Sequence, residues 1–224
     1  MVLIYKATIL RAPMVKTLSY LSSKDHCFVP MDALLSEVAQ SGDATHLQQL
    51  LRENPLILDS FVLLSTKNPL NIATVSGKID FVKEIIKLKP NLAKETNGDG
   101  FSPMHIAAAI GHVEIVKELM KVDPNLFRLE GREKRTPLHH AAIKGRLEVI
   151  SAMLSVCPGC IDAVTIYKET ALHLAVKNNQ AEATKVIVDW VREMNRDDIF
   201  NVKDEQGNTV LHLAVWKKQH QARN

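Results

Sequence analysis

A fifteen-residue segment of this chain returns 34 residues later in nearly the same form. SPMHIAAAIGHVEIV, which begins at Ser102, recurs as TPLHHAAIKGRLEVI, which begins at Thr136. A degenerate first copy, Leu35–Val38, precedes the series by 35 residues, and a late copy ends at Ala214 after a longer spacing of 39. A fixed period of this size is typical of a solenoid, in which each repeat buries its apolar face only against its neighbours. The alanines that mark the 34-residue spacing are Ala73, Ala107, Ala141 and Ala175.

Prolines provide a second marker in the same register. They recur with spacings of 35, 34 and 34 residues, at Pro55, Pro90, Pro124 and Pro158. A proline at a fixed place in each repeat is expected to stop a helix there, because it lacks the N–H that continues the helix. The two markers together predict an all-α array of helix-turn-helix units.

The residues of one repeat predict how each unit begins and ends. Thr136 can cap the first helix, and Pro137 suits its first position. The small pair Ala141 and Ala142 allows neighbouring helices to approach closely. Gly145 ends the helix where a positive φ is needed, and Asn179 takes that place in the following copy. The second helix carries apolar residues on one face, and turn-rich segments between units form short projecting fingers. In one copy those apolar residues are Val113, Val116, Leu119 and Met120.

The charge of the chain is unevenly distributed. The net charge is +3, and residues 1–30 hold four basic residues and one acidic residue, so the remainder is neutral. A neutral array is not expected to bind nucleic acid through bulk charge. The alternative of an RNA-binding array needs a basic stripe, which only a few residues of the array offer. These residues are Arg132, Lys134, Arg135, Lys144, Lys168 and Lys177. Three cysteines are too few for a disulfide framework and favour a reducing compartment.

Residues 1–30 lie outside the periodicity, and we interpret them as a disordered leader. They hold no acidic residue before Asp25, which also fits a transit peptide, and a misplaced translation start is a further alternative because Met31 begins the repeats cleanly. No stretch is long and apolar enough to span a bilayer. We predict a repeat domain over 31–220 and a tail over 221–224. Its repeats are expected near 31–66, 67–100, 101–134, 135–168 and 169–207, with a partial one over 208–220.

Several motifs resemble one plant family in particular. The segments at Cys157–Ile161, Glu169–Gln180 and Asp204–Ala214 are similar to those of the ankyrin-repeat membrane proteins with a C-terminal PGG domain. Within that family the chain most resembles the bian-da type and, more distantly, the accelerated-cell-death type. The resemblance implies an ankyrin fold, cytosolic repeats joined to C-terminal transmembrane helices, and roles in defence signalling and cell death. This chain reaches Asn224 before any such helix. We therefore expect a cytoplasmic protein, associated with the plasma membrane if its full-length product carries the transmembrane domain.

Motifs that could carry chemistry are weak in this sequence. The recurring His105, His139, His173 and His212 belong to successive repeats, whose packed helices lie about 10 Å apart, so they cannot converge on one metal. Cys157 and Cys160 have the spacing of half a zinc site or of a redox pair, but no second such pair exists. No nucleophile motif or phosphate-binding loop is present. We expect no enzyme, no cofactor and no bound metal.

The fingers and the inner ends of the first helices remain as a binding surface. Apolar, aromatic and charged side chains at such places are typical of a groove that binds another protein. We predict a non-enzymatic protein-interaction scaffold with a protein partner on its concave face. The alternative is the cytosolic regulatory part of a multi-pass, channel-like membrane protein. The predicted partner-binding residues are Phe101, Ile110, Arg132, Arg135, Lys144, Tyr167, Lys177 and Trp216.

Overall fold

The computed structural model describes residues 31–58 and 68–221, and the predicted leader lies outside these residues. The described part is built of α-helices and short 3-10 turns, with no strand. The helices are α2 (Met31–Ser41), α3 (Ala44–Glu53), α5 (Pro69–Val75), α6 (Ile79–Leu88), α7 (Pro103–Ile110), α8 (Val113–Val122), α9 (Pro137–Lys144), α10 (Leu147–Val156), α11 (Ala171–Lys177), α12 (Ala181–Glu193) and α13 (Val210–Gln221). The all-α prediction is confirmed.

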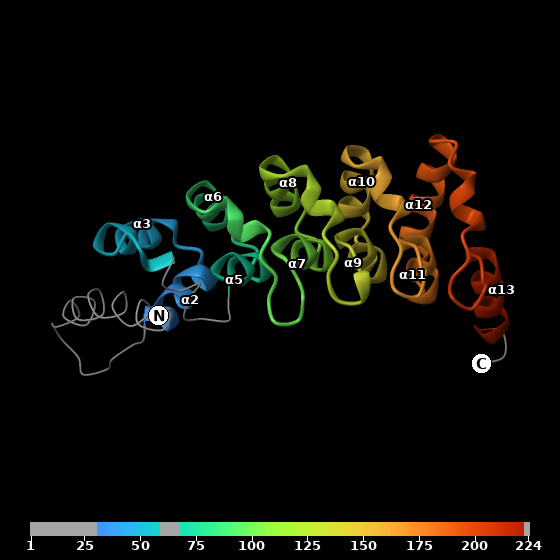
Figure 1. Ribbon diagram of the computed structural model, residues 1–224, viewed down its shortest axis with the longest axis horizontal. Helices are drawn as coiled ribbons and strands as arrows, with labels where there is room; N and C mark the ends of the chain where they lie inside the picture. The colour runs from blue at the N-terminus through green and yellow to red at the C-terminus, as the bar shows by residue number, and fades with distance from the viewer. Residues whose placement is uncertain (1–30, 59–67, 222–224) are drawn as a thin grey trace, which may run out of the picture. The chain divides into compact units, whose positions relative to one another are not determined.

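The helices form two layers along the array from α2 to α13 (Figure 1). The first helices of successive units pack on one another in the order α2, α5, α7, α9, α11 and α13. The second helices follow the same order, from α3 through α6, α8 and α10 to α12. Each unit therefore contacts mainly its neighbours, as a 34-residue period requires.

Turns with positive φ end the first helices at the predicted places. Gly77, Gly111 and Gly145 have φ values of 68°, 100° and 66°, and Asn179 has a φ of 58°. Asparagine is among the residues that tolerate this conformation best after glycine. The spacing of 35 from Gly42, whose φ is 81°, to Gly77 also agrees with the predicted offset of the first copy.

The recurrent alanines lie in the core between stacked helices. Ala73, Ala107, Ala141 and Ala175 are all fully buried. The second helix turns a slightly different face inward from the one predicted. In α8, Ile115 is buried with Val116 and Leu119, whereas Val113 and Met120 are only half-buried. The predicted stripe omitted Ile115, since an i, i+3, i+6, i+7 pattern only approximates the 3.6-residue turn.

Enlarging these alanines is expected to destabilise the array. Ala107→Leu or Ala141→Leu adds three carbon atoms at a buried helix contact, which should cost roughly 1–3 kcal/mol of unfolding free energy through overpacking. Urea denaturation followed by circular dichroism measures the loss. The exposed Ala181 at the start of α12 provides a matched control. Unfolding midpoints equal to that of Ala181→Leu for both variants would contradict the packing described here.

No helix within residues 31–58 and 68–221 is long and apolar enough to cross a membrane.

Candidate partner-binding surface

A histidine in the first helix of each central repeat, in α7, α9 and α11, forms a hydrogen bond to the finger of the next repeat. The N–H of Ser102 donates to His105 Nδ1 over 3.2 Å, and the Ser102 hydroxyl lies 2.8 Å from the same atom. Since Nδ1 accepts, Nε2 carries the proton and donates to the carbonyl of Arg135, 3.0 Å away. The same imidazole therefore caps its own helix and holds the finger of the following repeat.

The arrangement repeats along the array. His139 Nε2 lies 3.2 Å from the carbonyl of Glu169, and His173 Nε2 lies 3.3 Å from that of Asn208. Burial lowers the pKa of all three imidazoles, to about 4 at His139. These neutral, fully engaged rings have a structural role.

Backbone hydrogen bonds join neighbouring fingers. The N–H of Ile166 donates to the carbonyl of Glu133 over 3.1 Å, and the N–H of Glu205 donates to that of Tyr167 over 2.9 Å. Glu133 and Lys168 have positive φ values of 60° and 58°, so the fingers turn sharply at these residues. Three successive fingers are thus fixed relative to one another and can present their side chains together.

The predicted binding residues differ in how accessible they are. Arg132, Lys144, Tyr167 and Trp216 are exposed, with exposed fractions of 43% for Tyr167 and 56% for Trp216. Ile110 is half-buried. These four side chains therefore reach the surface of the array.

Phe101 and Arg135 are partly occupied within the array. The ring of Phe101 packs edge-on against His140, with 5.1 Å between ring centroids, and lies 6.3 Å from His105. Arg135 forms a 2.7 Å ion pair with Glu133 of the same finger. Both side chains therefore shape the surface more than they project from it.

Lys177 is the most constrained of the predicted residues. Its ammonium group lies 2.6 Å from Glu169 Oε1 and 3.1 Å from Asp204 Oδ2, and both acceptor residues are buried. Burial alone would lower the pKa of Lys177, but the two carboxylates raise it overall. Burial likewise opposes the ionised form of Asp204, whereas the N–H of Asn208 and the Lys177 ammonium lower its pKa overall. This triad joins α11 to the fingers on either side of it.

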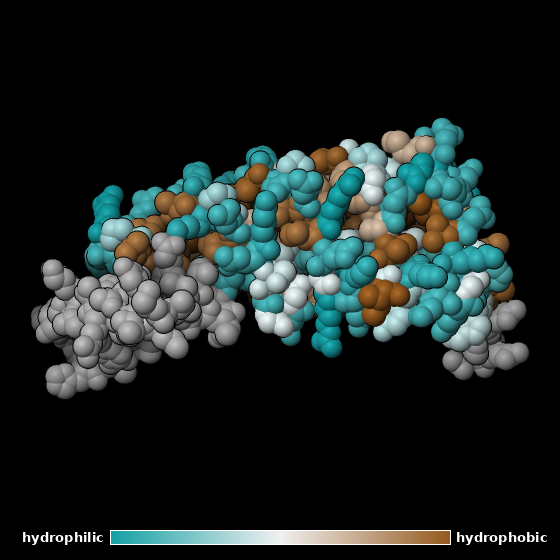
Figure 2. All heavy atoms as spheres, in the orientation of Figure 1, coloured by the Kyte–Doolittle hydropathy of each residue, from teal (hydrophilic) through white to brown (hydrophobic). Residues whose placement is uncertain are grey.

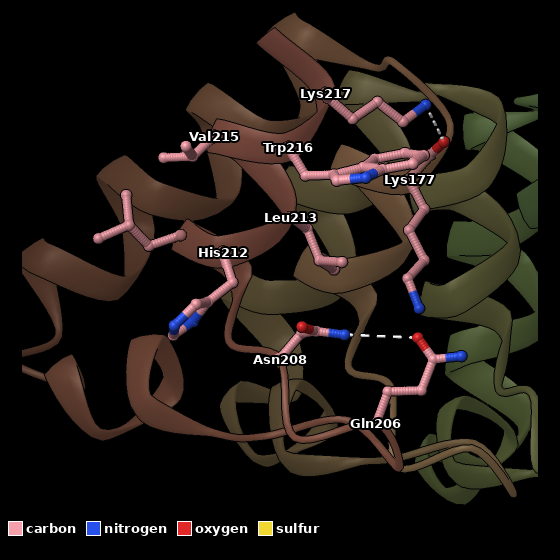
Figure 3. Close-up of a pocket in the computed structure, with 9 residues that line it drawn as sticks. Lys177, Gln206, Asn208, His212, Leu213, Val215, Trp216 and Lys217 are labelled. Atoms are coloured by element: carbon pink, nitrogen blue, oxygen red, sulfur yellow. Dashed lines mark hydrogen bonds between the residues drawn. The ribbon is translucent and has the colours of Figure 1, made fainter. Parts of the chain in front are cut away.

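A cavity of about 920 Å³ lies where α13 meets α11 and the last finger (Figure 3). It brings Lys177 and Trp216 together, whereas the other predicted residues lie outside it. Lys217 closes one side, since its ammonium donates to the carbonyl of Lys177 and lies 2.9 Å from Asn179 Oδ1. The lining consists of Lys177, Gln206, Asn208, Leu211, His212, Leu213, Val215, Trp216 and Lys217.

Exposed apolar side chains concentrate near this end of the array. Ile166 is 50% exposed beside Tyr167, and Leu211 and Val215 are 70% and 49% exposed on α13. Val164, 38% exposed, was not among the predicted residues, although its place in the same finger could have indicated it. On the face seen in Figure 2, hydrophobic patches lie between hydrophilic ones. Exposed apolar side chains thus occur both in the finger that holds Val164 and on α13.

Within the described residues, no three or more histidine, cysteine, aspartate or glutamate side chains are placed to hold a metal ion.

Comparison with known proteins identifies the family. The family model described as "Ankyrin repeats (3 copies)" matches residues 35–128, 70–163, 119–198 and 157–223. The chain is also 62% identical over 193 residues to "Ankyrin repeat-containing protein BDA1" of Arabidopsis thaliana, which confirms the predicted resemblance. The match covers 84% of this chain and 45% of that relative, so the chain spans a little under half of the relative's length. The chain therefore belongs to the ankyrin-repeat family.

Proposed function

We propose that this chain is a non-enzymatic scaffold that binds a protein partner on the concave face formed by its fingers and inner helices. Two findings support the proposal. Ankyrin-repeat proteins are generally not enzymes. Three of the four recurring histidines, which could otherwise suggest chemistry, are engaged in holding one repeat to the next: His105, His139 and His173.

The observation that carries the proposal is the group of exposed apolar and aromatic side chains on the finger of Tyr167 and on α13. The finger bearing Tyr167 is bonded to Glu205, and the following residue, Gln206, lines the cavity beside Trp216. Exposed aromatic side chains on a fixed backbone are the usual anchors of a protein interface. A partner that contacts both Tyr167 and Trp216 would bury them at little cost in backbone ordering.

The predicted residues then divide by role. Tyr167 and Trp216 are the proposed anchors, and the exposed Arg132 and Lys144 are proposed rim contacts that set the rate and salt dependence of association. Lys177 holds the surface in shape through its two carboxylate partners. The remaining proposed contacts, which are half-buried, are Phe101, Ile110 and Arg135.

The test is a quantitative pull-down from plant extract. The double variant Tyr167→Ala/Trp216→Ala should lower partner recovery by about tenfold or more, because interface anchors contribute about 2 kcal/mol or more each. Lys117→Ala/Glu118→Ala on α8 is the control, since it leaves the net charge unchanged and alters only the outer helix layer. If the control abolishes recovery while the first variant retains it, the binding surface is wrongly assigned.

We further propose that the partner acts in plant defence signalling, as the resemblance to the bian-da type implies. Plants that express the Tyr167→Ala/Trp216→Ala variant in place of the wild type should then lose part of their response to infection. A response equal to the wild type, despite loss of the partner in the pull-down, would contradict this role while leaving the scaffold proposal intact.

A second candidate is that the array is the regulatory part of a multi-pass membrane protein. The observation in its favour is that more than half of the relative from Arabidopsis thaliana lies outside the match. An antibody against the array should then find the native protein in membranes after an alkaline carbonate wash. Recovery of all the native protein in the cytoplasmic fraction would favour a cytoplasmic scaffold instead.

A further inference from the structure

Cys157 and Cys160 lie at opposite ends of one tight turn. Cys157 follows the last residue of α10, and a 3-10 turn over Pro158–Asp162 comes next. The N–H of Cys160 donates to the carbonyl of Cys157 over 3.0 Å. A hydrogen bond of this kind brings the two Cα atoms within about 7 Å, and a disulfide spans roughly 4.4–6.8 Å between Cα atoms. The backbone therefore already holds the two residues near the separation that a disulfide needs.

The two thiols differ sharply in their surroundings. Cys160 is 2% exposed and packs in the core, whereas Cys157 is half-buried. Burial, followed by the neighbouring Cys157, raises the pKa of the Cys160 thiol. An oxidant from solvent therefore reaches Cys157 first. Cys160 lies buried next to it and remains an uncharged thiol.

The repeat itself does not require this pair. In the preceding unit the same two places hold Asp123, whose carboxylate accepts from the N–H of Asn125, and the buried Leu126. A polar residue at the first place and an apolar residue three positions later therefore form the same turn without cysteine. The guanidinium of Arg128 lies over the turn, where a Cβ added to Gly159 would be 3.0 Å from its Nη2. The charge of Arg128 opposes the rise in the pKa of the Cys160 thiol, but burial outweighs it.

We propose that Cys157 and Cys160 form a reversible, peroxide-sensitive dithiol at the base of the finger that carries Ile166 and Tyr167. The Cys157 thiolate attacks one oxygen of hydrogen peroxide, the O–O bond breaks, and hydroxide leaves. This step oxidises the sulfur to a sulfenic acid and reduces the peroxide. The Cys160 sulfur then attacks the Cys157 sulfur, the S–O bond breaks, and the leaving hydroxide takes the Cys160 proton as water. A thiol reductant reverses the reaction.

The test uses the full chain with Cys27→Ser, which leaves this pair as its only cysteines. Hydrogen peroxide is added under native conditions, and intact mass and alkylatable thiols are measured. Both thiols should be lost together, with a mass decrease equal to two hydrogen atoms, and dithiothreitol should restore them. In Cys160→Ala the oxidation should stop at a dimedone-reactive sulfenic acid on Cys157. In Cys157→Ser the buried Cys160 should stay reduced.

Circular dichroism of each variant confirms that the compared proteins are folded. Retention of both thiols in the folded parent would overturn the proposal. Oxidation of Cys160 in folded Cys157→Ser, or disulfides formed only between two chains, would overturn it as well. Because the readout is covalent, loss of partner binding in the pull-down leaves this test unaffected.

Discussion

The free energy of unfolding of the array is expected to fall steeply as the pH decreases from about 6.5 to about 4. Burial lowers the pKa of His139 to about 4 and that of His140 to about 3 in the folded chain, and it also lowers the pKa of His105 and His173. An unfolded chain takes up protons on the rings of His139 and His140 below pH 6.5, whereas the folded chain takes up few until about pH 4. His139 and His140 should each cost about 1.4 kcal/mol of stability per pH unit in this window, because their rings are protonated there mainly in the unfolded chain.

The direction of the effect follows from which state binds more protons. Above pH 6.5 both states keep these rings neutral, so the histidines add no pH dependence. Below about pH 4, His139 becomes protonated in the folded state as well. Carboxyl groups with a lowered pKa, such as Asp204, then lose their own contribution as they take up protons.

Urea unfolding at several pH values between about 7.5 and 4.5 measures the slope of stability against pH. The variant His139→Gln should be less stable at neutral pH. On acidification it should lose stability less steeply, because the unfolded chain then takes up about one proton fewer relative to the folded chain. A flat profile over this window, or an unchanged slope in His139→Gln, would contradict the neutral buried histidines described here.

Replacement of Lys177 is expected to destabilise the array strongly. Lys177→Met leaves Glu169 and Asp204 buried without their cation. Removal of one partner from a buried ion pair costs about 3–5 kcal/mol. The side chain of Lys177 is 32% exposed, so solvent screening places the expected loss near the lower end, about 3 kcal/mol. Thermal and urea denaturation at neutral pH measure this loss.

A matched variant separates charge from packing. Lys177→Met/Glu169→Gln/Asp204→Asn removes all three charges, and the amide oxygen at position 204 can still accept from the N–H groups of Gln206 and Asn208. It should recover much of the lost stability, because the cost arises from unpaired buried charge. Stability of Lys177→Met equal to the wild type would show that the ion pairs contribute nothing. A triple variant no more stable than Lys177→Met would assign the loss to packing.

The parts of the fold that could be predicted are those set within one repeat. Thr136, Pro137 and Gly145 each act on the backbone next to them, so helix ends follow from the local sequence. The buried alanines follow from the period alone, since a residue repeated every 34 positions meets its own copy in the next unit.

Contacts between repeats could not be predicted in the same way. Lys177 was predicted as a binding residue, yet its ammonium lies between Glu169 and Asp204, which are 35 residues apart in the sequence. Phe101 packs against His140 from the next repeat. Such pairs depend on the position of each finger relative to the next repeat, and the sequence pattern within one repeat does not determine that position. Tyr167 and Trp216 are the aromatic residues among the exposed predicted ones, and their exposure in the structure is the reason for proposing them as anchors.

Hydrogen exchange of the array, alone and with its captured partner, tests the proposed scaffold most directly. The proposal predicts slower exchange on binding at residues 163–170 and 203–217, which hold the apolar finger, the last finger and much of α13. Exchange in α6, α8 and α10 of the outer layer should be unchanged. Slower exchange in those outer helices, with none in the fingers or α13, would contradict binding on the proposed surface.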